Sequence, residues 1–165
     1  MVILGVDPGT ATTGWGVVKT TPASKRKRLQ LLWVAHGTIE TPKGMLAQDR
    51  LLMLEKGLEK LFASYKPDLL AVERLYFFKN VKTALPVAEA RGVILLVTAK
   101  KGVPLQEFTP PQVKMAVTGY GNAQKKQVQL MVQEILGLKA LPKPDDAADA
   151  LGLAIASSVL TRGLK

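Results

Sequence analysis

The chain has 165 residues, no cysteine and a formal net charge of +10, so we expect one domain over residues 1–165 and exclude disulfides, thiolate nucleophiles and cysteine-based zinc sites. It contains no apolar run that could span a membrane and begins without a basic, signal-like segment, from which we expect a cytoplasmic location. The excess of lysine and arginine favours a polyanionic partner, most often nucleic acid, over a basic surface that serves only solubility.

Hydrophobic patterning predicts strands and helices in the order βββαβαβααα. The strands are short apolar runs, and the helices carry apolar residues at helical spacing, as Leu51, Leu54 and Leu58 do. This order is typical of an α/β domain in which a mixed five-stranded sheet is flanked by helices. In chain order we expect strands at residues 2–6, 13–19 and 29–40, a helix at 45–65, a strand at 68–73, a helix at 83–100, a strand at 103–108, and helices at 110–117, 123–136 and 145–160.

The segment between the second and third strands reads PASKRKR, residues 22–28. We expect an exposed turn, whose four adjacent cations from Lys25 to Arg28 either contact phosphate or form a solvated loop. The single histidine, His36, follows in the third strand between apolar residues. We interpret it as structural, which leaves carboxylates and lysines as the candidates for any chemistry.

The helix at 83–100 is too apolar to be a free surface helix, and it carries small residues such as Ala84, Ala88 and Gly92. Pro86 is expected within its first turn, where proline is tolerated. The helix belongs either to the core or to a subunit interface in which small residues allow close approach. We favour the interface and expect a homodimer through this helix, because two related active sites suit a substrate with two-fold symmetry.

Acidic residues stand at the ends of two predicted strands and near the start of the last helix. Asp7 ends the first strand and Glu73 ends the fourth, and strand ends are where α/β sheets bind ligands. Asp146 and Asp149 are three residues apart in the helix, so they share one face with about 5–6 Å between their Cβ atoms. If that helix packs beside the two strand ends, four carboxylates converge.

Converging carboxylates repel one another and raise their pKa values unless a cation neutralises them. Oxygen ligands select hard divalent ions, so Mg²⁺ or Mn²⁺ would suit such a cluster. Two such ions, about 3.5–4 Å apart, can activate a water and support an in-line attack on phosphorus. As a hypothesis, Asp7 stands at the end of its strand to bridge metal ions together with the other three acids.

Structural roles for the same acids remain open at this level. Any of Asp145, Asp146 and Asp149 could cap the last helix and complement its dipole, and Asp145, directly after a proline, suits that role best. Spacing alone does not choose between the pairs 146/149 and 145/149, since residues four apart also share a face. Glu73 could simply pair with Arg74.

The sequence resembles the RuvC family of Holliday-junction resolvases, the crossover junction endodeoxyribonucleases. The resemblance runs in order from residue 2 to about residue 158 and rests on the blocks GVDPGTATTGWGVV, LLAVERLYFFKN, ALPVAEARGV, PPQVKMAVTGYGNAQKKQVQLMV and DDAADALGLAIA. It implies a ribonuclease-H-like fold, a homodimer, and Mg²⁺-dependent resolution of four-way junctions by paired symmetric nicks in strands of like polarity. The products would carry 5′-phosphates, and the biological setting would be homologous recombination and DNA repair.

The resemblance also implies which acids are catalytic. The four catalytic and metal-binding acids of the family fall on Asp7, Glu73, Asp146 and Asp149, so the match selects Asp146 over Asp145. Two Mg²⁺ ions per active site are implied, with Mn²⁺ as a substitute.

DNA-contacting residues follow from the same match. Two lysines that family members place near the cleaved strand match Lys114 and Lys125. The aromatic residue at the junction centre matches Tyr76, where members commonly show phenylalanine, with Phe77 beside it and Lys79 in the same loop. Aromatic side chains there would stack on unpaired bases. A further implied partner is the RuvA–RuvB branch-migration complex.

Other readings of the sequence differ in substrate or in class. A related ribonuclease-H-like nuclease, such as a YqgF-like protein or an RNA-strand hydrolase, would share the metal chemistry but prefer another nucleic acid. A non-catalytic junction-binding module would bind the junction and cut nothing. The segment VDPGTATTG also resembles the phosphate-binding hairpin of sugar kinases and actin, but those proteins need two such domains, for which 165 residues are too few.

Overall fold

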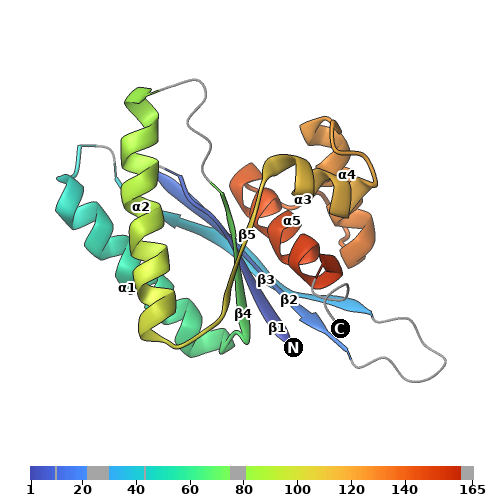
Figure 1. Ribbon diagram of the computed structural model, residues 1–165, viewed down its shortest axis with the longest axis horizontal. Coiled ribbons are helices and arrows are strands. Elements are labelled where there is room, and N and C mark those ends of the chain that lie inside the picture. The colour runs from blue at the N-terminus through green and yellow to red at the C-terminus, as the bar shows by residue number, and fades with distance from the viewer. Residues whose placement is uncertain (10, 22–29, 43, 75–80, 161–165) are drawn as a thin grey trace.

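The fold is built on one mixed sheet whose strands lie in the order β3-β2-β1-β4-β5 (Figure 1). The computed structural model describes residues 1–9, 11–21, 30–42, 44–74 and 81–160, with the backbone alone for residues 81–83. The predicted element order is confirmed. The elements are β1 (Val2–Asp7), β2 (Thr12–Thr20), β3 (Leu31–Glu40), α1 (Ala47–Tyr65), β4 (Leu69–Glu73), α2 (Val81–Lys100), β5 (Leu105–Phe108), α3 (Pro110–Thr118), α4 (Lys125–Leu136) and α5 (Asp145–Leu160).

The strand directions explain why the acids at the strand ends meet. β1, β2 and β3 are antiparallel neighbours, whereas β4 runs parallel to β1 and β5 runs parallel to β4 after the crossover helices α1 and α2. Parallel strands end at the same edge of a sheet. Val6 of β1 is paired with Val72 of β4, so the next residues, Asp7 and Glu73, both lie at that edge.

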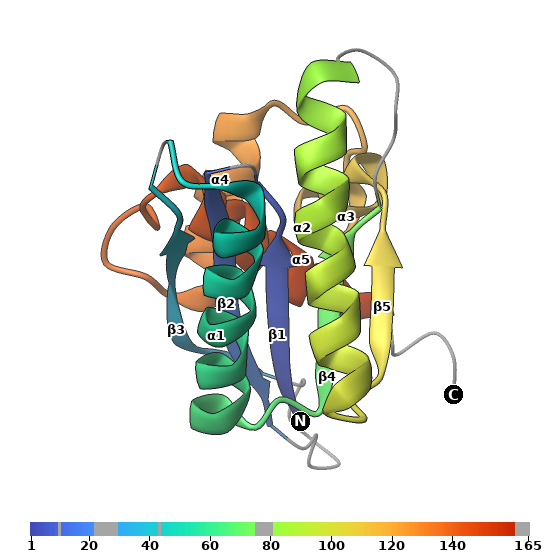
Figure 2. The same ribbon diagram turned by 90° about the vertical axis from the view of Figure 1, so that its left-hand side faces the viewer.

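Helices cover both faces of the sheet. Figures 1 and 2 show α1 and α2 on one face and α3, α4 and α5 on the other. Side chains alternate between these layers along each strand, so in β1 Leu4 and Val6 join the core under α1 and α2, while Ile3 joins the core under α5. By the same alternation, Gly5 and Asp7 lie on the face that α5 covers.

The structure corrects the prediction for α2. The helix begins at Val81 rather than at residue 83, so Pro86 is its sixth residue and lies beyond the first turn. Proline there lacks the N–H that would donate to the carbonyl four residues back, at a local cost of about 3 kcal/mol. The helix nevertheless continues, because burial of Ala90, Ile94 and Val97 against the sheet outweighs that cost.

The last helix is the centre of the molecule. Side chains from Ala147 to Ser158 are buried, with the exception of Asp149, which is half-buried. A surface helix would show a polar stripe over this length, so the apolar residues all round α5 reflect burial on every side. Even so, no helix in the described part of the chain is long and apolar enough to cross a membrane.

Candidate active site

Glycines in β1 and β2 let α5 rest directly on the sheet. A Cβ atom on Gly5 would lie 2.0 Å from the backbone oxygen of Ala150, and one on Gly14 would lie 2.0 Å from that of Asp146. Gly14 is also the cross-strand partner of Asp7. The first turns of α5 are therefore brought next to the end of β1, which no side chain larger than hydrogen would permit at these positions.

This packing brings four carboxylates together. The pKa of Asp7 is raised from its ordinary value of 3.8 to about 8, first by burial and then by the negative charges of Glu73, Asp149 and Asp146. Lys125 lowers that pKa only in part. Asp7 therefore lies within electrostatic range of the other three acids that the sequence singled out.

Glu73 faces the same cluster from the end of β4. Its side chain is half-buried, and its pKa is raised by burial and by the charge of Asp149. The alternative in which Glu73 pairs with Arg74 is not what the structure shows, because the guanidinium of Arg74 lies 3.6 Å from Glu107 instead.

Asp145 takes a different position from the other acids of α5. Its side chain is 65% exposed, and it lies 3.5 Å from the ammonium of Lys125. It does not contribute to the raised pKa of Asp7, whereas Asp146 and Asp149 both do. The rotation of α5 about its axis thus selects the pair 146/149, which spacing alone could not do.

Lys125 is the cation that meets this cluster. Its Nζ donates to Oδ2 of Asp149 over 2.9 Å. Burial lowers the pKa of Lys125, but the hydrogen bond and negative charge of Asp149, together with Asp145, outweigh burial and raise it. As the first residue of α4, Lys125 also stands at the positive end of a helix dipole, so the two aspartates offset an otherwise unfavourable placement.

A cavity of about 190 Å³ opens beside the acids. Lys114 of α3 and Lys125 of α4 line it together with Glu73 and Asp149. Its remaining wall is mostly apolar and consists of Pro110, Val113, Val128 and Leu153. Both lysines that the sequence comparison singled out are therefore at the acidic site.

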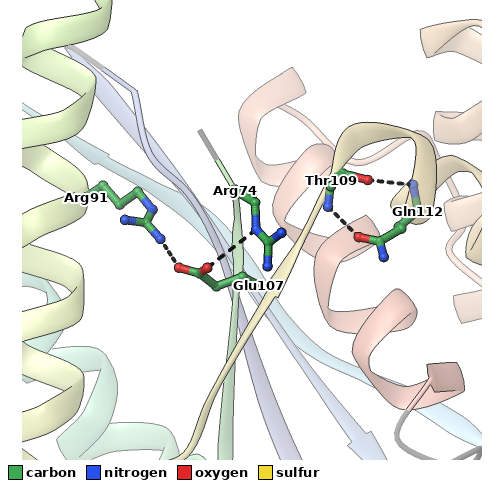
Figure 3. Close-up of polar contacts among 5 residues, drawn as sticks. All are labelled: Arg74, Arg91, Glu107, Thr109 and Gln112. Atoms are coloured by element: carbon green, nitrogen blue, oxygen red, sulfur yellow. Dashed lines mark hydrogen bonds and ion pairs between the residues drawn. The ribbon is translucent and has the colours of Figure 1, made fainter. Parts of the chain in front are cut away.

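Helix caps hold the two lysine-bearing helices in place. Thr109 Oγ1 accepts a hydrogen bond from the backbone N–H of Gln112 over 3.3 Å. Oε1 of Gln112 accepts one from the backbone N–H of Thr109 over 2.8 Å (Figure 3). This capping box starts α3 directly after β5. The backbone amide of Gln124 likewise donates to the side chain of Gln127, ahead of the first turn of α4.

Several other predicted residues are outside the part of the chain that the structure describes. Tyr76, Phe77 and Lys79 fall in residues 75–80, outside the described residues, as do the cations Lys25 to Arg28. His36 accepts a hydrogen bond at Nδ1 from the indole of Trp33 over 2.9 Å, and burial lowers its pKa. This contact within β3 agrees with the structural role expected for His36.

Sequence reasoning missed one ionic group near the site. Glu107 of β5 pairs with Arg91 of α2 and with Arg74, which directly follows Glu73 (Figure 3). A glutamate inside a short strand whose residues are half-buried or buried was the available signal, because a charged group is rarely placed there without a partner.

The donor set fits a hard divalent cation. The clustered donors are carboxylate oxygens, which Mg²⁺ and Mn²⁺ prefer, and the raised pKa of Asp7 is the effect that a bound cation would reverse. In the described residues, however, no three histidine or acidic side chains already stand close enough to share one ion. Asp149 in particular is turned toward Lys125, so binding would require it to leave that partner.

The chain matches a known protein family over most of its length. Residues 3–157 match the family described as Crossover junction endodeoxyribonuclease RuvC. A protein of that name from Syntrophomonas wolfei is 52% identical over 155 residues, covering 94% of this chain and 87% of the relative.

Two solved structures are similar over almost the full length. The structure of Thermus thermophilus RuvC is 32% identical with a TM-score of 0.89, covering 99% of this chain and 96% of that one. The same T. thermophilus protein in complex with a Holliday junction substrate is 31% identical with a TM-score of 0.87, with the same coverage. The expected ribonuclease-H-like fold class is confirmed by this likeness.

Proposed function

This chain belongs to the RuvC family of crossover junction endodeoxyribonucleases, and we propose that it resolves four-way Holliday junctions in DNA by paired symmetric nicks in strands of like polarity. The observation that carries the proposal is the convergence of Asp7, Glu73, Asp146 and Asp149 at one sheet edge, with the pKa of Asp7 raised to about 8. An acidic cluster that a single lysine compensates only in part is costly to fold and has a direct use in phosphodiester hydrolysis. The nicks would leave 5′-phosphates, as recombination and repair require.

Two Mg²⁺ ions are the proposed cofactors, and Mn²⁺ would substitute for them. Asp7 and Glu73 would hold them from the sheet, and Asp146 and Asp149 from α5. When bound, such ions lower the barrier to hydrolysis by neutralising the charge that develops on the phosphate. The sheet and α5 carry the ligands on rigid elements, which keeps the spacing of the acids constant from one cleavage to the next.

Lysines beside the acids would bind the DNA backbone. Lys114 and Lys125 line the cavity next to Glu73 and Asp149, so a phosphate entering it would meet two ammonium groups. Lys125 would exchange its contact with Asp149 for one with the phosphate. Tyr76 and Phe77 would stack on unpaired bases at the junction centre, a contact worth about 1–3 kcal/mol per base, and Lys79 would bind phosphate nearby.

A homodimer would supply the second nick. Helix α2 buries Ala90, Ile94 and Val97 against the sheet, while Leu85 and Leu96 on its other face are 65% and 52% exposed. Core contacts occupy one face of the helix, and the exposed outer face would be the interface with an identical partner. Two sites related by a two-fold axis would cut the two strands of like polarity.

The proposal extends to the cellular context of the enzyme. The substrate would be delivered by the RuvA–RuvB branch-migration complex. We expect the enzyme to act in the cytoplasm.

The test is cleavage of a synthetic four-way junction by the wild type and by Asp149→Asn, with and without Mg²⁺. We expect paired nicks only with wild type and Mg²⁺, a loss of at least roughly 100-fold in rate for the variant, and junction binding that the variant keeps. Asp145→Asn is the matched control, because Asp145 has the same side chain, the same helix and the same partner, Lys125, but is 65% exposed and is not among the acids that raise the pKa of Asp7. We expect it to cut at close to the wild-type rate.

The outcomes separate the alternatives. Junction binding without nicking under any divalent ion would make the protein a binding module. Preferential cutting of an RNA–DNA hybrid or of plain duplex in the same assay would identify a different nuclease of the same fold.

A further inference from the structure

Glu107 bridges two arginines on the face of the sheet opposite to the acidic cluster. Its Oε1 accepts from Nη2 of Arg91 on α2, and its Oε2 lies 3.6 Å from Nε of Arg74 (Figure 3). The three side chains come from β5, α2 and the residue directly after β4. They therefore connect three separate segments of the chain at one point.

Burial makes this contact hard to replace. The side chains of Arg91 and Glu107 are only 19% and 26% exposed, whereas that of Arg74 is 54% exposed. Nε of Arg91 is buried without a hydrogen-bond partner among the described residues. Glu107 therefore provides the counter-charge for this guanidinium group. A buried charge that loses its partner is strongly destabilising.

Arg74 and Glu107 both lie next to Glu73 in the sheet. Arg74 follows Glu73 in the chain, and Glu107 precedes the residue that is paired with Glu73. In the pairing of β4 with β5, Glu107 stands opposite Val72, and Phe108 stands opposite Glu73. The amide of Arg74 donates to the carbonyl of Phe108 over 2.8 Å, so the pairing of the two strands continues past Glu73.

Strand alternation then places the two functions on opposite faces. Val72 packs in the core under α1 and α2, which puts Arg74 and Glu107 on that side and Glu73 on the side of α5. The acid thus sits between Val72, which is fully buried, and Arg74, whose guanidinium faces Glu107. A shift of Arg74 would turn the end of β4 and with it the carboxylate of Glu73.

We propose that Glu107 is a positioning residue for hydrolysis: by pairing with Arg91 and Arg74 it fixes the end of β4, and so holds the Glu73 carboxylate toward Asp149 and Asp7. This inference rests on the proposed nuclease function. Glu107 itself touches neither substrate nor metal. It acts through the backbone of β4.

The test compares Glu107→Gln with a control that carries the same substitution. Glu55→Gln is matched to it, because Glu55 is also 26% exposed and also pairs with a cation of α2, Lys100, over 2.7 Å. For each protein we would measure the single-turnover rate of junction cleavage at saturating Mg²⁺, junction affinity without divalent ions, Mn²⁺ affinity by calorimetry, and the thermal midpoint.

A positioning role predicts a specific pattern. Glu107→Gln should slow cleavage roughly 10- to 100-fold and weaken Mn²⁺ binding, with junction affinity unchanged within about twofold. Glu55→Gln should change none of these by more than about twofold, because its ion pair with Lys100 connects α1 with α2 and does not involve β4. Wild-type cleavage and wild-type Mn²⁺ affinity in Glu107→Gln would overturn the proposal, and a lower thermal midpoint alone would show a merely stabilising ion pair.

If Glu107→Gln does not fold, the same measurements would be made on the double variant that carries both Arg91→Gln and Glu107→Gln. This pair is neutral, so it removes the unpaired buried charge and should restore the fold. Slow cleavage and weak Mn²⁺ binding in the folded double variant support positioning, and recovery of both overturns it.

The two proposals fail in different ways. If the wild type cuts no junction, the nuclease function falls. In that case the Mn²⁺ affinities of wild type and Glu107→Gln still decide whether Glu107 orients the acidic cluster.

Discussion

At the scale of single residues, Asp7 shows how function opposes stability. Its carboxyl group is buried beside three other acids, which raises its pKa to about 8. In the unfolded chain the group would ionise near its ordinary value of 3.8. Between these two values the folded protein binds a proton that the unfolded chain does not, so this group makes folding less favourable as pH rises through that window.

The resulting prediction concerns Asp7→Asn without divalent ions. The variant should be more stable than the wild type at pH 8 by an amount of the order of a few kcal/mol, and the difference should shrink toward pH 4, close to the value of 3.8 at which Asp7 ionises in the unfolded chain. Urea unfolding at both pH values measures it. Taking the difference between variant and wild type removes the titration of His36, whose pKa is also shifted but which is not among the groups that act on Asp7. Equal stability gains at pH 4 and pH 8 would contradict the assignment.

At the scale of elements, the docking of α5 on β1 and β2 positions the site. Gly5 and Gly16 are cross-strand partners, and Gly14 pairs with Asp7, so glycine occupies the strand positions on which the helix lies. A Cβ on Gly16 would lie 2.7 Å from the side chain of Leu151. The distance between the sheet and α5 is therefore set by the absence of side chains on the strands rather than by their packing.

Gly14→Ala should disrupt this docking. The new methyl group would lie 2.0 Å from the backbone oxygen of Asp146, so α5 must move and carry its aspartates with it. We expect destabilisation of about 1–3 kcal/mol, as for other overpacked sites, together with a loss of cleavage. Gly121→Ala is the control, because its nearest contact would be an ordinary 3.6 Å. Thermal unfolding and junction cleavage check both variants, and a fully stable and active Gly14→Ala would refute this account.

At the scale of the whole molecule, α2 divides its surface between the core and the outside. Leu85, Glu89, Gly92 and Leu96 follow at intervals of four, three and four residues, so they share one face, and all four are exposed. A Cβ on Gly92 would meet nothing within 4 Å in the single chain. This face can approach a second copy closely.

The homodimer proposal therefore predicts the effect of Leu96→Glu. An added charge on the proposed seam should convert a dimer into a monomer in sedimentation, because burying two unpaired carboxylates across a two-fold axis is unfavourable. Leu52→Glu on α1 is the control, since Leu52 is 47% exposed and lies on a different helix. A wild type that is monomeric at working concentration would remove the basis for paired nicks.

Much of this architecture follows from local patterns. Apolar runs, helical spacing and breaks at proline or glycine predicted every element within a few residues. They do so because the buried face of a strand or helix requires apolar residues at a characteristic spacing along the sequence. The predicted start of α2, residue 83, is two residues later than the observed start, Val81. The prediction kept Pro86 within the first turn, because proline disfavours the helix interior, but packing against the sheet outweighs that preference.

By itself the sequence determined the α/β class, the order of elements and the residue types of the proposed oxygen-donor metal site. Tertiary structure decided which acids of α5 face Asp7, that Lys125 meets Asp149, and that Glu107 joins Arg91 to Arg74. The reason is physical: residues three and four apart both share a helix face, so only the contact of α5 with glycines of the sheet sets its rotation. Ion pairs between β5, α2 and the end of β4 likewise join segments that lie far apart in sequence, and only the completed fold brings them together.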